Sequence, residues 1–274
     1  MRNEKSRYSN KIKSIAIGSF DGMHVAHQAL VERVEALVII ERGGGYLTPG
    51  YKRACYTDRV CCFYDFERIR DLTPEGFVAR LQTDFPQLDK IVVGYDFVFG
   101  KEKLGTAKTL RILFDGKVEI VPEVSIEGVS VHSRTIKMYL REGNIAMANQ
   151  LLGRTYTIEG EVIAGQGLGK KALVPTLNLR VKAYQLPIDG VYATRTLVAD
   201  IWLPSVSFLG HRVTTDGSFA VETHILQGDI GEVQGRVEVK FIDFLRANRK
   251  FESLEALKIQ IDADIKRAKA YSER

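Results

Sequence analysis

The sequence predicts two domains of different class: a parallel α/β domain in residues 1–152, and a small antiparallel β barrel with a C-terminal helix in residues 153–274. Wholly apolar runs such as residues 37–40 alternate with helical patterns in the first half, which is typical of parallel strands covered on both faces. From Thr155 onward, runs of alternating apolar and polar residues are separated by Gly, Asp and Pro turns, which is typical of an all-β barrel.

The first domain is expected to alternate strands and helices. The expected strands are 14–17, 36–40 and 90–94, and the expected helices are 24–35, 73–83 and 133–152. The second domain is expected to begin near residues 152–154, where the pattern changes, and a piece from Arg154 to the end should fold by itself. Its expected strands are 156–163, 190–193, 219–226 and 236–241.

The last predicted helix begins with Ser253 as its N-cap, with Glu255 in the first turn. Its apolar residues recur at helical spacing and predict a face that packs on the barrel. They are Leu254, Leu257, Ile261 and Ile265.

Length and composition limit the class of protein. A chain of 274 residues can bury two cores, and 45% hydrophobic with 27% charged residues is ordinary globular usage, which excludes collagen-like, coiled-coil and disordered chains. No apolar run approaches the ~20 residues that cross a bilayer, and the charged start lacks the apolar stretch of a signal peptide. We therefore expect a cytoplasmic protein with no membrane contact.

Charge and cysteines indicate little about partners. The net charge of +5 suits an anionic partner, but the basic residues are scattered, so phosphorylated small molecules explain the charge as well as nucleic acid does. Cys55, Cys61 and Cys62 have no histidine nearby to complete a metal site, so we interpret them as small hydrophobic residues.

The stretch GSFDGMHVAHQ, residues 18–28, leads from a buried strand through a glycine turn into a helix. Such a turn presents backbone N–H groups that can hold phosphate. A helix beginning near Met23 would place His24 and His27 on one face of its first turn. Two imidazoles there can donate hydrogen bonds to phosphate and stabilise charge during transfer, although either histidine alone would as readily be structural.

This stretch resembles the FDGxHxGH signature of the nucleotidyltransferase superfamily, and in particular the adenylyltransferase half of bacterial bifunctional riboflavin kinase/FAD synthetases. Ala26 stands where the family has glycine. The resemblance implies a Rossmann-like nucleotidyltransferase fold in which His24 and His27 are catalytic. It also implies an ATP and phosphate site at Gly18, Phe20, Asp21 and Gly22.

Two further segments of the first domain look like elements of this family. Residues 92–100 are similar to VVGxDFxFG, which implies that Asp96 lines the flavin and nucleotide pocket, whereas Phe97 and Phe99 fit core packing equally well. Residues 131–137 align with V-S-S-T-x-x-R, which implies that Ser133 and Lys137 bind the triphosphate. Lysine cannot form the fork of an arginine, so this clamp is altered.

In the second half, residues 165–178 are glycine-rich but lack the spacing of a P-loop. They resemble the riboflavin kinase segment GrxLGFPTxN, which implies a glycine-rich flap over ATP, with Thr176 and Asn178 holding Mg²⁺ and phosphate. Residues 221–224 resemble VExH, which implies that Glu222 is the kinase base. An acid in an alternating strand is otherwise more often a solvated residue. His224 should share its face, and we interpret it as structural.

The resemblance implies that the chain phosphorylates riboflavin to FMN in the barrel and joins FMN to AMP in the α/β domain, giving FAD and pyrophosphate. ATP, riboflavin and FMN are then the substrates and Mg²⁺ is the cofactor, with no nucleic acid partner; the oligomeric state is not predicted. Two alternatives stay open: an enzyme with one half silenced, and a non-catalytic flavin-sensing or RNA-binding regulator.

Overall fold

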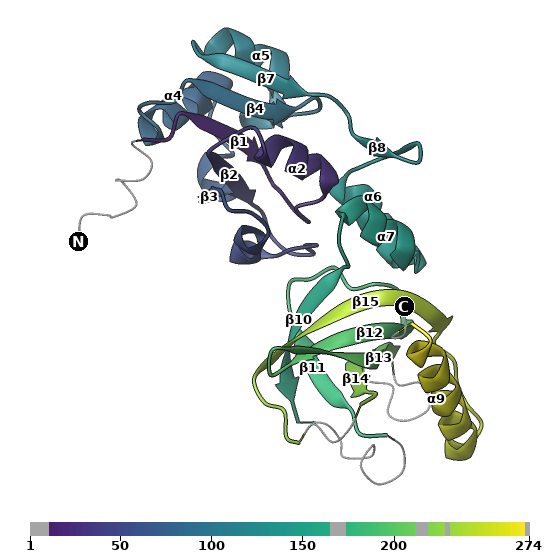
Figure 1. The fold of residues 1–274 in the computed structure, drawn as a ribbon. Coiled ribbons are helices and arrows are strands. Elements are labelled where there is room, and N and C mark those ends of the chain that lie inside the picture. The colour runs from purple at the N-terminus through teal and green to yellow at the C-terminus, as the bar shows by residue number, and fades with distance from the viewer. Residues whose placement is uncertain (1–10, 165–173, 212–218, 228–230, 272–274) are drawn as a thin grey trace. The chain divides into compact units, whose positions relative to one another are not determined.

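The computed structural model describes residues 11–164, 174–211, 219–227 and 231–271 (Figure 1). By its internal contacts the chain divides into two units, Met1–Ser133 and Arg134–Arg274. The glycine-rich segment predicted to cover ATP lies outside the described residues at positions 165–173. The domain boundary at residues 152 and 153 stays a prediction.

The first unit contains a five-stranded parallel sheet in the order β3-β2-β1-β4-β7, which confirms the predicted α/β class. Its strands are β1 (Ser14–Gly18), β2 (Ala36–Glu41), β3 (Val60–Asp65), β4 (Lys90–Gly94) and β7 (Lys117–Val121). Because β1 pairs in parallel with both β2 and β4, the strand order reverses beside β1. In open parallel sheets, ligands bind outside the carboxyl ends of the strands at this kind of position.

Helices and short hairpins complete the first unit. The α-helices are α2 (Val25–Val31), α3 (Phe66–Ile69), α4 (Pro74–Asp84) and α5 (Ala107–Leu113), and the 3₁₀ helices are η1 (Gly50–Tyr56) and η2 (Lys101–Lys103). The hairpins pair β5 (Val98–Phe99) with β6 (Gly105–Thr106), and β8 (Ser125–Ile126) with β9 (Val129–Ser130). Thus α2 is shorter than the helix predicted over 24–35.

The two faces of the sheet pack into two separate cores, which explains the wholly apolar strands. Ile15 and Ile17 of β1 join the core beneath α4 and α5, whereas Ala16 between them joins the core beneath α2. Alternate residues of a strand point to opposite faces, so a strand covered on both sides needs apolar residues at every position. Phe99 lies in the first of these cores and Phe97 packs against it. This favours core packing, rather than a place in the ligand pocket, for both phenylalanines.

The second unit is built around a closed barrel in the order β10-β11-β14-β13-β12-β15, and every pairing in it is antiparallel, as predicted. Its strands are β10 (Thr157–Ile163), β11 (Leu177–Val181), β12 (Gly190–Val198), β13 (Ile201–His211), β14 (Phe219–Ile225) and β15 (Arg236–Ala247). Its helices are α6 (Ser133–Glu142), α7 (Ile145–Leu152) and α9 (Leu254–Lys269).

The single helix predicted over 133–152 is wrong, because the chain forms α6 and α7 there. Gly143 takes a left-handed φ of 76° after α6, a conformation that ends helices and favours glycine. Asn144 then caps α7 by accepting a hydrogen bond from the backbone N–H of Met147. The 3.6-residue apolar period continues through both helices, so periodicity alone did not reveal the break.

The helix α9 is capped by Ser253 as predicted, since its hydroxyl accepts a hydrogen bond from the N–H of Ala256. The predicted apolar stripe is wrong at Leu254, which is 55% exposed. The most buried residues of the helix are Asp264 and Ala268. Asp264 accepts hydrogen bonds from Nε and Nη2 of Arg246 in β15, so a paired charge anchors this helix to the barrel.

The helices α6 and α7 are bonded to the barrel by backbone and amide groups. The Leu140 carbonyl of α6 accepts from the N–H of Ile188, which precedes β12. Asn149 of α7 donates to the Phe241 carbonyl of β15 at 3.0 Å and accepts from the N–H of Tyr156 at 2.7 Å. These bonds place both helices in the second unit although they precede the predicted boundary. In the described part of the chain, no helix is long and apolar enough to cross a membrane.

We expect a fragment of residues 134–274 to melt about 5 °C or more above a fragment of residues 154–274. The shorter fragment lacks α6 and α7, so the Phe241 carbonyl and the Tyr156 N–H lose their partner Asn149. Thermal unfolding followed by circular dichroism measures the difference. Equal melting temperatures would contradict this expectation and support the boundary at residues 152 and 153.

Candidate active sites

The turn between β1 and α2 is built on backbone conformations that are uncommon outside glycine. Phe20, Gly22 and Met23 have positive φ angles of 50°, 91° and 42°. Non-glycine residues in this region carry strain and persist where surrounding packing holds them. Phe20 and Met23 are 0% and 1% exposed in the core beneath α2, so their side chains hold the turn in place.

His24 and His27 lie against each other at the end of this turn. His24 is the N-cap of α2, and its Nδ1 accepts a hydrogen bond from the N–H of His27. The two rings stack with centroids 3.6 Å apart and 15° between their planes, and the Phe20 ring lies 5.2 Å from His27. The pairing expected from their spacing is therefore confirmed, with the helix starting at Val25 rather than near Met23.

Asp21 accepts hydrogen bonds from the backbone of the loop that follows β2. Its carboxylate is buried and accepts hydrogen bonds from the N–H groups of Leu47 and Thr48 at 2.8 and 3.1 Å. Its backbone carbonyl accepts from the Ser133 hydroxyl at 2.7 Å. The structure thus brings Asp21 and Ser133 together, and Lys137 lies one turn further along α6 on the same face as Ser133.

The loop that bonds to Asp21 is itself held in place by a buried arginine side chain. Arg53 of η1 is 0% exposed, pairs with Glu41 at the end of β2, and has its guanidinium 4.6 Å from the centre of the Tyr46 ring. The Tyr46 hydroxyl accepts from the N–H of Arg42 at 2.7 Å, and burial together with the Glu41 charge raises the pKa of Tyr46. Nothing in the sequence pattern around Arg53 indicates this role.

Asp96 follows β4 at the edge of the sheet where Gly18 ends β1. It is more than half exposed, and its carboxylate lies 3.8 Å from Nδ1 of His132. The Tyr95 hydroxyl donates to Glu123 and lies 3.1 Å from Nε2 of the same histidine. Loss of solvent around the hydroxyl and its hydrogen bond to Glu123 raise the pKa of Tyr95. Sequence reasoning missed His132 beside Asp96 and Glu123 beside Tyr95.

In the barrel, strand pairing brings together two segments that are far apart in the sequence. Asn178 of β11 lies directly opposite Glu222 of β14, and the preceding pair is Leu177 with Thr223. Residues directly opposite in antiparallel strands project from the same face with Cβ atoms about 5 Å apart. The predicted metal ligand and the predicted base are therefore neighbours, with Thr176 two residues before Asn178.

His224 shares a strand face with Glu222 and has a structural contact. Its Nδ1 lies 2.7 Å from the carbonyl oxygen of Pro175. A carbonyl oxygen only accepts hydrogen bonds, so Nδ1 carries the proton and donates it. This bond ties β14 to the segment that contains Thr176.

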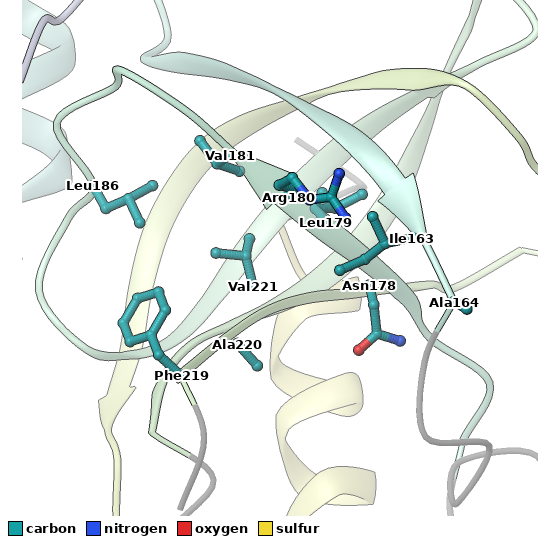
Figure 2. Close-up of a pocket in the computed structure, with 10 residues that line it drawn as sticks. All are labelled: Ile163, Ala164, Asn178, Leu179, Arg180, Val181, Leu186, Phe219, Ala220 and Val221. Carbon is teal, nitrogen blue, oxygen red and sulfur yellow. The ribbon is translucent and has the colours of Figure 1, made fainter. Parts of the chain in front are cut away.

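A cavity of about 320 Å³ opens beside Asn178 (Figure 2). Its polar side chains are those of Asn178 and Arg180, and the remaining lining is aliphatic or aromatic. The apolar residues are Ile163, Ala164, Leu179, Val181, Leu186, Phe219, Ala220 and Val221. Pockets of this composition suit a largely apolar ligand with a few polar groups.

The described residues contain no group of three or more His, Cys, Asp or Glu side chains placed to hold a metal ion. The residues at the barrel site supply hydroxyl, amide and carboxylate oxygens instead. Oxygen ligands of this kind suit a hard divalent cation that is also bound by substrate phosphates.

Fold and sites together define a protein that joins a nucleotidyltransferase-like parallel sheet to a closed β barrel. The FAD synthetase family matches residues 53–135 and the riboflavin kinase family (Flavokinase) matches residues 152–272. The bifunctional riboflavin kinase/FMN adenylyltransferase of Pseudomonas fluorescens is 32% identical over 93% of this chain and 91% of its own, and that of Listeria monocytogenes is 28% identical over 94% and 92%. The chain belongs to the bifunctional riboflavin kinase/FMN adenylyltransferase family, as the resemblance implied.

A solved structure is similar to this chain over nearly its full length. It is the crystal structure of a protein from Streptococcus pneumoniae that is named as a macrolide-efflux protein. That protein is 26% identical to this chain and superposes with a TM-score of 0.83 over 95% of this chain and 96% of its own.

We expect Asp21→Ala to lower the free energy of unfolding of the first unit by about 2–3 kcal/mol, because two buried N–H groups lose a charged acceptor. Asp21→Asn keeps an acceptor oxygen and should cost about 1 kcal/mol or less. Urea denaturation of the full chain measures both. Equal losses for the two variants would show that the hydrogen bonds to Leu47 and Thr48 are not the stabilising contact.

Proposed function

We propose that the chain makes FAD from riboflavin in two ATP-dependent steps, phosphorylation of riboflavin in the barrel and adenylylation of FMN at the parallel sheet. Membership of the bifunctional family supports both steps. The observation that carries the proposal most directly is the pairing of Asn178 with Glu222, because it sets the proposed ligand of metal and phosphate opposite the proposed base. The kinase half would begin near residue 153.

In the first step, Glu222 accepts the proton of the terminal ribityl hydroxyl. The hydroxyl oxygen then attacks the γ-phosphorus of ATP, the bond to the ADP oxygen breaks, and FMN and ADP result. In this proposal the largely apolar cavity lined in part by Asn178 takes the flavin ring. His224 holds the Pro175 carbonyl, which keeps Thr176 and Asn178 beside Glu222.

A divalent cation, Mg²⁺ in this proposal, fits the oxygen donors of Thr176 and Asn178. Bound there with ATP, it would neutralise charge on the transferring phosphoryl group. Thr176 and Asn178 supply neutral ligands, so Glu222 remains available as the base.

In the second step, a phosphate oxygen of FMN attacks the α-phosphorus of ATP, and pyrophosphate leaves. The nucleophile is already anionic at neutral pH, so the step needs positioning and charge stabilisation rather than a strong base. His24 and His27 donate hydrogen bonds to the ATP phosphates. Gly18, Phe20, Asp21 and Gly22 form the turn that presents them.

Three further residues complete the adenylyltransferase site in this proposal. Ser133 and Lys137 bind the triphosphate from one face of α6, with Lys137 acting as a single charge in place of the arginine fork. Asp96, held beside His132, lines the nucleotide and flavin pocket.

Incubating the purified chain with riboflavin, ATP and MgCl₂, and separating the flavins by chromatography, tests the proposal. We expect FMN to appear first and FAD to follow. FMN without FAD, or FAD only from supplied FMN, would identify a single-activity enzyme. Binding of riboflavin without either product would identify a non-catalytic flavin binder.

We expect His24→Ala or His27→Ala to reduce FAD formation from FMN by about a hundredfold or more, because each removes a donor to charge that develops in the transition state. FMN formation from riboflavin should stay within twofold of wild type, since the barrel has its own site. Initial rates of both reactions on the same preparation measure the effect. Equal loss of both activities would point to misfolding or to one shared site.

We expect Glu222→Gln to reduce kcat for FMN formation by about a hundredfold, because the amide keeps the shape but cannot accept the proton. Riboflavin binding and FAD formation from FMN should change little. Glu238→Gln on β15 is the matched control, because Glu238 pairs with Glu159 and Leu197 and lies away from Asn178. A wild-type rate for Glu222→Gln would remove Glu222 from the mechanism.

A further inference from the structure

Five hydroxyl side chains are buried together inside the barrel. They come from three strands, β12, β13 and β14, and none is more than 4% exposed. They are Thr194, Thr196, Ser205, Ser207 and Thr223. Neither the predicted catalytic residues nor the apolar core of the barrel accounts for them.

These hydroxyls are joined in a closed ring. Thr194 bonds to Ser205 and Ser207, and Thr196 bonds to Ser205 and Thr223. The bond from Ser207 to Thr223 closes the ring, and the five oxygen–oxygen distances lie between 2.8 and 3.1 Å. Every member of the ring therefore takes part in two hydrogen bonds.

In the ring each hydroxyl donates one hydrogen bond and accepts one, and all five bonds run in the same sense around the ring. Each hydroxyl has one proton to donate, so five bonds among five hydroxyls require every member to donate once and accept once. Ser207 donates to Thr223, which sets the direction for the other four bonds. Removing any one hydroxyl leaves the neighbour that donated to it as a buried donor without an acceptor, so the members depend on one another.

The ring reaches β14 at the residue next to the proposed base. Thr223 points into the barrel, whereas Glu222 and His224 on either side of it point to the other face. In the strand ladders, Thr223 lies opposite Leu177 on one side and Ser207 on the other. Its two ring bonds therefore restrict rotation of β14 about its own axis, and this rotation sets the direction of the Glu222 side chain.

We propose that the hydroxyl ring acts as one cooperative unit that fixes the orientation of the Glu222 side chain. In this proposal Thr223 is a positioning residue for riboflavin phosphorylation. The functional part of this inference rests on the proposed kinase activity of the barrel. Thr196 strengthens the link, because it lies on β12 and bonds directly to Thr223 although β13 separates the two strands.

Kinetics of Thr223→Val test the positioning role, because valine keeps the shape of threonine and lacks the hydroxyl. We expect kcat for FMN formation to fall about tenfold with KM for riboflavin within twofold, since the loss is in alignment and not in substrate contact. Thr223→Ser keeps the hydroxyl and should restore most of the rate. The matched control is Thr157→Val on β10, whose hydroxyl bonds to the Thr155 carbonyl outside the ring.

The assays are run at a temperature where circular dichroism shows every variant folded. A kcat within twofold of wild type for Thr223→Val would overturn the positioning role, as would a loss in Thr223→Ser equal to that in Thr223→Val. If Glu222→Gln also proved fully active, there would be no base to aim, and this part of the inference would fail with it.

Hydrogen exchange of Thr194→Val tests the ring as a unit without relying on catalysis. Among the residues that the structure describes, the Thr194 hydroxyl bonds to Ser205 and Ser207 alone, both on β13. If the ring acts as a unit, the backbone amides of β14 should exchange several-fold faster in this variant than in the wild type. Faster exchange confined to β12 and β13 would overturn the cooperative ring. If the wild-type chain made no FMN, the proposed function would be refuted. The hydrogen-exchange comparison would still decide whether the ring is cooperative.

Discussion

The pairing of β11 with β14 is the interaction on which the barrel and its site depend. It joins two strands separated by about forty residues of chain, β12 and β13 among them, and without it the barrel would have two open edges. The same ladder sets Asn178 opposite Glu222. Closing the barrel and assembling the proposed site are thus one event, because a slip of one residue in this register would turn Glu222 to the other face.

The α/β unit uses a buried carboxylate in a comparable way. Asp21 lies in the strained turn before His24 and accepts two N–H groups from the loop after β2. The buried Arg53 guanidinium packs over the Tyr46 ring and stabilises that loop. A turn with positive φ at two non-glycine residues is costly, and fixed neighbours on both sides are what keep it in one conformation.

Both units therefore place paired polar groups inside apolar surroundings. They are the Asp264–Arg246 pair, the Asp21 carboxylate with the N–H groups of Leu47 and Thr48, and the ring of hydroxyls. A buried hydroxyl left without a partner costs about 1–3 kcal/mol, so such groups are tolerated only when their bonds are complete. Complete networks also permit a single arrangement of the elements that carry them, which suits sites that need fixed geometry.

The sequence by itself determined the two fold classes, the principal elements of each unit that it predicted, and the closeness of His24 and His27, because these follow from period, turn residues and spacing over short stretches. It did not reveal the break between α6 and α7, the exposure of Leu254, or the assignment of both helices to the barrel unit. Only the tertiary structure decided that Asn178 faces Glu222, that Arg53 supports Asp21, and that five scattered hydroxyls close into a ring. Each of these depends on strand register and on which residues meet across the core, and contacts between distant segments leave no periodic signal in the chain.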